Sequence, residues 1–300
     1  MIIVERLTKR YGDLTAVDDV SFTARRGEVL GIVGPNGAGK TTTLECIEGL
    51  RRPDAGRIRV LGQSAGSAAV KERIGVQLQA SSYFDHLTLE ETLELFGRFY
   101  RRNLSPAHLL ARVGLEDKAR TTVRKLSGGQ QQRFSIAATL VNDPEVMILD
   151  EPSTGLDPQA RRDLWDLARD INADGRTILL TTHYMEEAEH LCDRVAIMDR
   201  GRIVALDSPR ELVNALPDRD EVRFKLPHGV AVDGLHRLAA VTTASVAEAE
   251  RVSLRSTDAS ETLRDVIDWA RQEGFELAGL EVASATLNDV FLSLTGNPFE

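Results

Sequence analysis

The sequence predicts an α/β fold with a largely parallel central sheet, followed by a small appended α/β unit. Short apolar runs such as Val29–Val33 and Val146–Leu149 alternate with segments that carry helical periodicity or helix caps. Strands that alternate with helices in this way form sheets of parallel strands. The pattern changes near Pro209–Asp220, so we expect two domains, residues 1–215 and residues 216–300.

The predicted strands are short and are bounded by turn residues. Tyr11-Gly12-Asp13 separates the first two strands, and Asp54-Ala55-Gly56 precedes another, because glycine and aspartate favour turns. In chain order, we expect strands at residues 1–8, 14–24, 29–33, 57–61, 146–149, 176–182, 221–226, 250–255 and 275–282.

Helix signals occupy the intervals between these strands. Thr88 with Glu91 three residues later forms a capping box. Pro106 stands at a first helical position and Gly114 at a helix end. In chain order, we expect helices from about residue 40, at residues 88–101, at residues 105–114, from about residue 129, and at residues 158–173 and 259–273.

Composition and charge restrict the class of protein. Hydrophobic residues make up 42% and charged residues 28% of the chain, as in soluble globular proteins. The net charge of -9 argues against a general nucleic-acid binder, since such proteins need Lys and Arg to neutralise phosphates. Because no segment has the ~20 apolar residues that cross a bilayer, and the N-terminus lacks the pattern of a signal peptide, we expect a cytoplasmic protein. Cys46 and Cys192 have no metal-ligand spacing and are expected to be buried hydrophobes.

A glycine-rich loop after the third predicted strand indicates a phosphate site. It fits the pattern G-x-x-x-x-G-K-[ST], with the residues Gly34, Pro35, Asn36, Gly37, Ala38, Gly39, Lys40 and Thr41. Glycines let backbone N–H groups turn toward phosphate oxygens, and the following helix directs its positive end at the same anion. Lys40 would reach the β- and γ-phosphates, and the Thr41 hydroxyl would bind Mg²⁺.

Two acids end the apolar run Val146–Leu149. In nucleotide hydrolases an Asp at such a strand end holds the Mg²⁺ shell, and we expect this role for Asp150. Glu151 would act as the general base that polarises the attacking water. Taken alone, the pair could also be two solvated acids at a strand end; the phosphate loop upstream favours the catalytic interpretation.

Leu126–Gln130, with the sequence LSGGQ, is a second candidate anion site. Ser127 and the exposed N–H groups of the following helix start could bind a phosphate, although two glycines could also form only a hinge. One chain would then carry two phosphate sites, which suggests a nucleotide held between two copies.

These three motifs together resemble the ATPase subunits of ABC transporters, over about residues 1–210. The resemblance implies a P-loop ABC ATPase domain, that is, a RecA-like core with a β subdomain and a helical subdomain. It also implies ATP and Mg²⁺ as cofactors, and a homodimer with ATP between the copies. The appended unit, residues 216–300, matches no catalytic pattern, and we expect it to support the dimer or regulate its closure.

By the same resemblance, further positions acquire roles. Tyr11 is similar to the aromatic that stacks on adenine, and His183 to the γ-phosphate contact. Gln79 is similar to the glutamine that reaches Mg²⁺ and the water, with Gln77 as a nearby competitor. Ser153–Asp157 is similar to the loop that crosses to the other subunit. The implied nucleotide-binding residues are Tyr11, Gly34, Pro35, Asn36, Gly37, Ala38, Gly39, Lys40, Thr41, Thr42, Ser127, Gly128, Gly129, Gln130 and Asp157; the implied metal ligands are Thr41, Gln79 and Asp150; the implied catalytic residues are Glu151, His183 and Gln79.

The family resemblance also points to a transport process. TTHYMEEAEHLCDRVAIMDRGRI and the tail Ala285–Gly296 resemble bacterial drug exporters of the daunorubicin-resistance kind. This implies a subunit on the inner face of the cell membrane that powers a separate membrane permease, with export of drugs or other hydrophobic compounds and without nucleic acid as a partner. The alternatives are an exporter of lipid, polysaccharide or ions, and a soluble ABC ATPase that acts on ribosomes or DNA.

Overall fold

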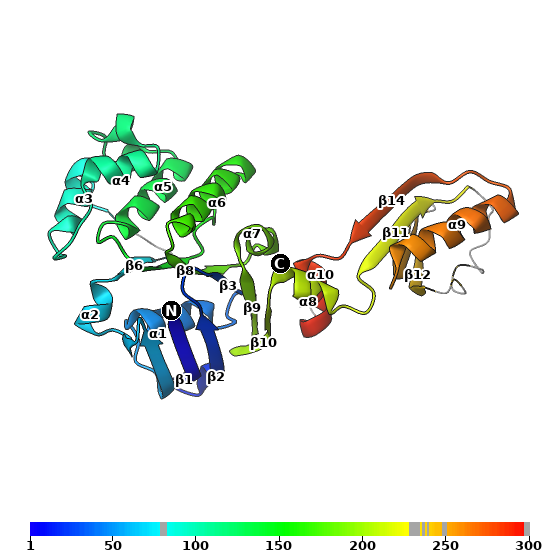
Figure 1. The fold of residues 1–300 in the computed structure, drawn as a ribbon, viewed down its shortest axis with the longest axis horizontal. Coiled ribbons are helices and arrows are strands. Elements are labelled where there is room, and N and C mark those ends of the chain that lie inside the picture. The colour runs from blue at the N-terminus through cyan, green and yellow to red at the C-terminus, as the bar shows by residue number, and fades with distance from the viewer. Residues whose placement is uncertain (79–82, 228–234, 236–237, 239, 248–250, 297–300) are drawn as a thin grey trace. The chain divides into compact units, whose positions relative to one another are not determined.

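The computed structural model describes residues 1–78, 83–227, 235, 238, 240–247 and 251–296 (Figure 1). It separates two compact units, Met1–Pro209 and a second that begins at Arg210. The boundary expected from the sequence, after residue 215, falls beyond the short helix α8, Pro209–Asn214. Each unit has its own sheet and its own hydrophobic core.

The first unit begins with a small antiparallel sheet in the order β2-β1-β4-β5. Its strands are β1 (Ile2–Tyr11), β2 (Leu14–Ala24), β4 (Ala55–Val60) and β5 (Gln63–Ser64). Ile2 pairs with Ala24 on one side and with Val60 on the other, and all three side chains are buried. This sheet therefore packs its apolar face on the rest of the unit.

The central sheet has the strand order β10-β9-β3-β8-β7-β6. Its strands are β3 (Val29–Val33), β6 (Ile74–Gln77), β7 (Val146–Asp150), β8 (Thr177–Thr182), β9 (Arg194–Asp199) and β10 (Arg202–Asp207). The neighbouring strands β9, β3, β8, β7 and β6 are parallel to one another. The remaining strand of this sheet, β10, is antiparallel to its neighbour β9. Every residue of β3, β7 and β8 is buried, as expected for parallel strands covered on both faces. The predicted α/β fold is confirmed.

Helices flank the central sheet on both sides (Figure 1). They are α1 (Lys40–Glu48), α2 (Ala68–Lys71), α3 (Leu89–Gly97), α4 (Pro106–Arg112), α5 (Gly128–Thr139), α6 (Pro158–Ala173) and α7 (Met185–Leu191). In Figure 1, α3, α4 and α5 lie on one side of the central strands, and the β1–β2 sheet lies on the other. The first unit thus contains a helical layer and a β layer around a parallel core.

The capping box at Thr88 is confirmed, but the prediction that this helix runs to residue 101 is wrong. Thr88 accepts from the Glu91 N–H, and the Glu91 side chain accepts from the Thr88 N–H. The helix ends at Gly97, whose carbonyl accepts a hydrogen bond of 3.1 Å from the Asn103 side chain. The same carbonyl accepts a hydrogen bond of 3.1 Å from the Tyr100 N–H, three residues on, so the chain tightens into a turn here and the α-helical pattern stops.

The second unit is a four-stranded antiparallel sheet covered by a helix. Its order is β12-β13-β11-β14, with β11 (Asp220–Lys225), β12 (Val241–Ala247), β13 (Arg251–Ser256) and β14 (Ala278–Ser284). Helix α9 (Ala259–Glu273) contributes Val266 to a core with Phe224 and Leu254, and α10 (Leu287–Thr295) follows β14. The appended α/β unit is present, with a strand, β12, that its polar sequence VTTASVA did not indicate.

Glu48, the last residue of α1, is a buried acid. Only 4% of its surface is exposed, and neither carboxylate oxygen has a hydrogen-bond partner among the described residues. Burial, with a smaller contribution from the charges of Asp150 and Glu45, raises the pKa of Glu48 to about 7. A glutamate in the unfolded chain has a pKa of about 4.3. Between about pH 4.3 and pH 7, therefore, Glu48 holds a proton in the folded protein that it releases in the unfolded chain.

We predict a pH-dependent gain of stability for Glu48→Gln. The pKa of Glu48 is raised on folding, so its contribution is complete at acid pH and is lost as the pH rises through about 7. The variant should match wild type near pH 4, below the unfolded pKa, and unfold at a higher denaturant concentration near pH 8. Chemical denaturation at both values measures this, with the exposed Glu90→Gln as control. An equal difference at both pH values would contradict the prediction.

Candidate nucleotide-binding site

The loop between β3 and α1 is shaped to receive an anion. Two of its glycines are required by space, since a Cβ at Gly34 would lie 2.2 Å from the Met198 carbonyl oxygen and one at Gly39 would lie 2.3 Å from that of Ala16. Gly39 caps α1 with a left-handed φ of 100° and without a side-chain hydrogen bond. The first N–H groups of α1 are therefore left for a ligand.

Lys40 lies buried inside this loop. Its Nζ donates to the Gly34 carbonyl at 2.7 Å and to the Pro35 carbonyl at 3.2 Å, and lies 3.6 Å from the Glu151 carboxylate. Burial lowers the pKa of Lys40, and the charge of Glu151 opposes this shift. A cation 5% exposed among carbonyls and one acid can bind phosphate oxygens with little rearrangement.

Asp150 ends β7 and lies against two hydroxyls. It accepts a hydrogen bond of 2.5 Å from Thr181 and one of 3.5 Å from Thr41. Burial raises the pKa of Asp150, and these two hydrogen bonds oppose the shift. Thr41 and Asp150 thus present two oxygen atoms close together. Mg²⁺ is typically bound by one or two such oxygens of the protein, while phosphates and water complete its coordination shell.

Glu151 is held in a strained conformation by the ends of two strands. Its φ is 49°, in the left-handed region, and its N–H donates to the carbonyl and the hydroxyl of Thr181. The carboxylate lies 3.0 Å from His183 Nδ1 and accepts from the Thr154 hydroxyl at 3.2 Å. Strain of this kind persists where the surroundings impose it, typically at functional sites.

The structure brings most of the predicted nucleotide-binding residues to one cavity. The cavity has a volume of about 370 Å³ and is lined by Tyr11, Leu14, Ala16, Asn36, Gly37, Ala38, Gly39, Lys40, Thr41, Thr42 and Glu151. The Tyr11 ring is 40% exposed, with Lys9 Nζ 5.5 Å and Arg51 Cζ 5.8 Å from its centre. Tyr11 therefore lines the same cavity as the phosphate loop, with two cations near its ring.

The LSGGQ motif lies in a different cavity. Ser127 caps α5, accepting from the Gln130 N–H, while the Gln130 side chain accepts from the Ser127 N–H. Gly128, Gly129, Gln130 and Asp157 line this cavity of about 420 Å³, which shares no lining residue with that of the phosphate loop. The Asp157 carboxylate caps α6 by accepting from two N–H groups. The LSGGQ motif and the phosphate loop therefore lie in two separate cavities of the chain.

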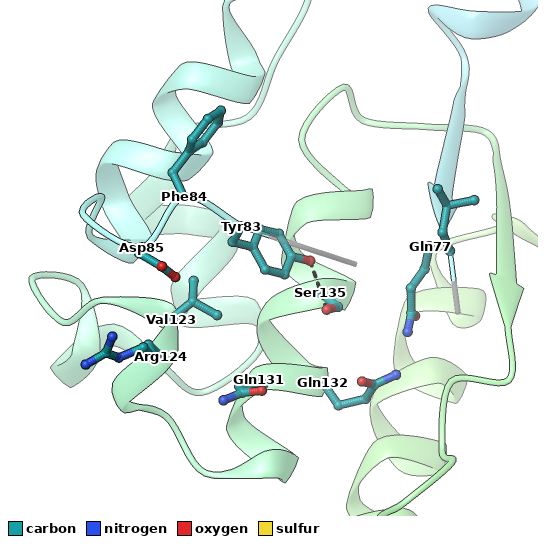
Figure 2. A pocket seen from close by; sticks show the side chains of 10 residues that line it. Gln77, Tyr83, Phe84, Asp85, Val123, Arg124, Gln131, Gln132 and Ser135 are labelled. Carbon is teal, nitrogen blue, oxygen red and sulfur yellow. Dashed lines mark hydrogen bonds between the residues drawn. The ribbon is translucent and has the colours of Figure 1, made fainter. Parts of the chain in front are cut away.

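Gln79 lies outside the described residues, so its predicted contacts stay a prediction. Gln77 is described and ends β6, with 4% of its surface exposed. It lines a third cavity of about 330 Å³ with Tyr83, Phe84 and Val123. Figure 2 shows Tyr83 directed toward Ser135 on α5, to which its hydroxyl donates at 2.9 Å, while Phe84 points away from Ser135.

The threonines that hold the two acids were not identified from the sequence. Thr181 bonds Asp150 and Glu151, and Thr154 bonds Glu151. A signal was present, since Thr181 belongs to a polar run that ends the apolar strand before His183.

Over the described ranges, no helix is long and apolar enough to span a membrane.

Comparison with known proteins agrees with this geometry. The ABC transporter family profile matches residues 17–154, and a profile of C-terminal domains of ABC-transporter-domain-containing proteins matches residues 221–286. Among solved structures, a dimeric ATP-binding cassette in a post-hydrolysis state with ADP and phosphate is 28% identical, with a TM-score of 0.63, over 69% of this chain and 98% of that one. A subunit of an ABC transporter complex from Clostridium perfringens is 30% identical, with a TM-score of 0.65, over 71% of this chain and 90% of that one.

Two curated relatives extend over nearly the whole chain. The Nod factor export ATP-binding protein I of Ralstonia nicotianae is 41% identical over 99% of this chain and 94% of its own length. The daunorubicin resistance ATP-binding protein of Streptomyces coeruleorubidus is 40% identical over 99% of this chain and 96% of its own length. With this similarity along both of its units, the chain belongs to the ATP-binding subunits of the ABC transporter family.

Proposed function

We propose that this chain binds Mg²⁺-ATP between two copies of itself and hydrolyses it to power a separate membrane permease. The observation that carries the proposal is that Lys40 and Glu151 line one cavity 3.6 Å apart, with His183 3.0 Å from Glu151. The LSGGQ half-site in another cavity supports the requirement for a second copy.

ATP would lie along the first cavity with its adenine on Tyr11. The phosphates would take hydrogen bonds from the N–H groups of the Gly34–Gly39 loop and charge from Lys40. Thr41 and Asp150 would hold Mg²⁺, which would neutralise charge on the β- and γ-phosphate oxygens. Gln79 would add a contact to Mg²⁺ and to the water.

Hydrolysis would proceed by positioning and by charge stabilisation. A water would attack the γ-phosphorus as the bond from that phosphorus to the bridging oxygen of the β-phosphate breaks and ADP leaves, and Glu151 would accept the proton that the water releases. His183, which lies 3.0 Å from Glu151, would contact the γ-phosphate and hold Glu151 in place. Lys40 would stabilise the negative charge on the transferred group.

The second copy would complete the site. Ser127, Gly128, Gly129 and Gln130 of that copy would cap the γ-phosphate, because the N-terminus of α5 presents N–H groups to an anion. Asp157 ends the loop that would cross between the copies. The dimeric cassette to which this chain is similar supports that arrangement. All motifs are intact in this sequence, so the two copies would be identical and both sites would be active.

The permease would dock on the cavity shown in Figure 2. Phe84 is 59% exposed, and Asp85 and Arg124 supply a charge of each sign beside Val123. A short helix with apolar and charged side chains fits such a surface. The subunit would therefore be peripheral on the inner face of the cell membrane. Relatives named for export of Nod factors and for daunorubicin resistance favour export of a hydrophobic compound over action on ribosomes or DNA.

Glu151→Gln should slow ATP hydrolysis at least ~100-fold, because the water loses its general base. ATP affinity should be retained, so the ATP-bound dimer should accumulate. Steady-state ATPase assays and gel filtration with Mg²⁺-ATP measure the two effects. Undiminished turnover would remove Glu151 from the role of base.

Lys40→Ala should weaken ATP binding by about tenfold or more, because charge-assisted hydrogen bonds to the phosphates are lost. Titration with a fluorescent ATP analogue measures this, and the exposed Lys71→Ala serves as the control. Equal affinity of both variants for nucleotide would count against the phosphate-loop assignment.

Phe84→Ala should reduce permease binding by about tenfold, since a central aromatic contributes much of the energy of an interface. The test is a pull-down from detergent-solubilised membranes of the source organism, in the Glu151→Gln background with ATP. Phe99→Ala is the matched control, because Phe99 is 72% exposed and does not line the cavity. A multi-span protein retained equally by both variants would place the docking surface elsewhere, and recovery of ribosomal or DNA-repair proteins alone would overturn the transporter assignment.

A further inference from the structure

A fully buried carboxylate lies beside the catalytic ends of β7 and β8. Glu187, on α7, is 0% exposed, and its Oε1 accepts a hydrogen bond of 2.9 Å from the indole N–H of Trp165 on α6. Burial raises the pKa of Glu187, against the opposing effect of hydroxyls from Thr182 and Ser153. One carboxylate on α7 therefore faces α6, the end of β8 and the loop after β7.

This carboxylate is costly to keep buried. Oε2 of Glu187 and Oγ of Ser153 have no hydrogen-bond partner of regular geometry among the described residues, although the Ser153 hydroxyl is close enough to lower the pKa of Glu187. A buried polar atom without such a partner typically costs about 1–3 kcal/mol. An apolar side chain at this position would avoid the cost, so stability alone does not explain the acid.

The two hydroxyls beside Glu187 belong to the segments that carry the catalytic residues. Ser153 follows Glu151 by two positions, and Thr182 directly precedes His183. Because Glu151 and His183 are themselves 3.0 Å apart, a shift of either segment changes their contact. Glu187, on α7, lies beside both the segment after β7 and the end of β8. It can therefore set the distance between these two segments.

A side chain of α6 also contacts the segment that carries His183. The centre of the Tyr184 ring lies 4.1 Å from that of the His183 ring. The guanidinium of Arg161, a residue of α6, lies 3.9 Å from the centre of the Tyr184 ring. The Tyr184 N–H also donates to Thr182 Oγ1 at 2.9 Å. Arg161 is one helical turn from Trp165, so α6 contacts both Tyr184 and Glu187.

We propose that Glu187 is a positioning residue for ATP hydrolysis. It aligns Glu151 and His183 through Ser153 and Thr182, and its hydrogen bond with Trp165 fixes the carboxylate on α6. Glu187 does not touch the nucleotide in this assignment, so ATP binding does not depend on it. The inference rests on the proposed hydrolysis at Glu151.

The test compares Glu187→Gln with wild type in the full chain. Glutamine keeps the size of the side chain but removes its charge and places an amide in the pocket. We expect kcat to fall roughly 10- to 100-fold, since small misplacements of catalytic groups have effects of this size, while KM for ATP stays unchanged. Wild-type kcat in this variant would overturn the proposal, whereas an inactive wild-type protein would instead refute the proposed function.

Glu28→Gln is the matched control for neutralising a buried glutamate. Glu28 is 6% exposed and pairs with Arg194 at 3.2 Å, but it precedes β3 and lies at the opposite end of the parallel strands from the site. It should lower the thermal stability without changing kcat. Equal losses of kcat in both variants would mean that the effect is general destabilisation, and would overturn the positioning role.

A double-mutant cycle tests the route through Ser153. Ser153→Ala alone should lower kcat in the same direction as Glu187→Gln, and the double variant should be no slower than the slower single variant. Residues that act through one contact are non-additive in this way. Fully additive losses of kcat would show that Glu187 does not act through Ser153.

Discussion

The register of three neighbouring parallel strands determines the chemistry of this protein. β3, β8 and β7 pair so that Val33 lies opposite Thr182, and Asp150 lies opposite Thr181. Because parallel strands all end at the same edge, the residues that follow them meet there. The phosphate loop after β3, the acids at the end of β7 and the histidine after β8 thus converge from segments that are far apart in the chain.

Charge balance then stabilises this convergence. Lys40, Asp150 and Glu151 are all buried, and burying a single unpaired charge is costly. They are placed so that each offsets part of the cost of another, with Lys40 3.6 Å from Glu151 and Asp150 satisfied by threonine hydroxyls. The same arrangement places a positive charge and an acid at one cavity, and phosphoryl transfer to water uses a charge of each kind.

The LSGGQ motif and the phosphate loop lie in two separate cavities of one chain, which fits the dimeric cassette to which this chain is similar. Ser127 and the N-terminus of α5 open into a cavity that shares no lining residue with the phosphate loop. A catalytic site that is completed only when two copies close can couple hydrolysis to movement, because closure and chemistry then depend on each other. The Tyr83–Ser135 hydrogen bond connects the cavity of Figure 2 to α5, the helix that begins within LSGGQ.

The sequence by itself determined the features that depend on neighbours in the chain. The glycines of the phosphate loop, Lys40, the acids after Val146–Leu149 and the Thr88 cap are all local patterns whose physical requirements lie within a few residues. Only the tertiary structure decided the rest: the fixing of Asp150 depends on Thr181, which is 31 residues away. Glu187 is the clearest case, because on α7 its sequence neighbours Glu186 and Glu189 are exposed acids and nothing local distinguishes it from them. Its burial follows from the packing of α6 and two strand ends around it, and such contacts between distant segments are settled by the fold as a whole.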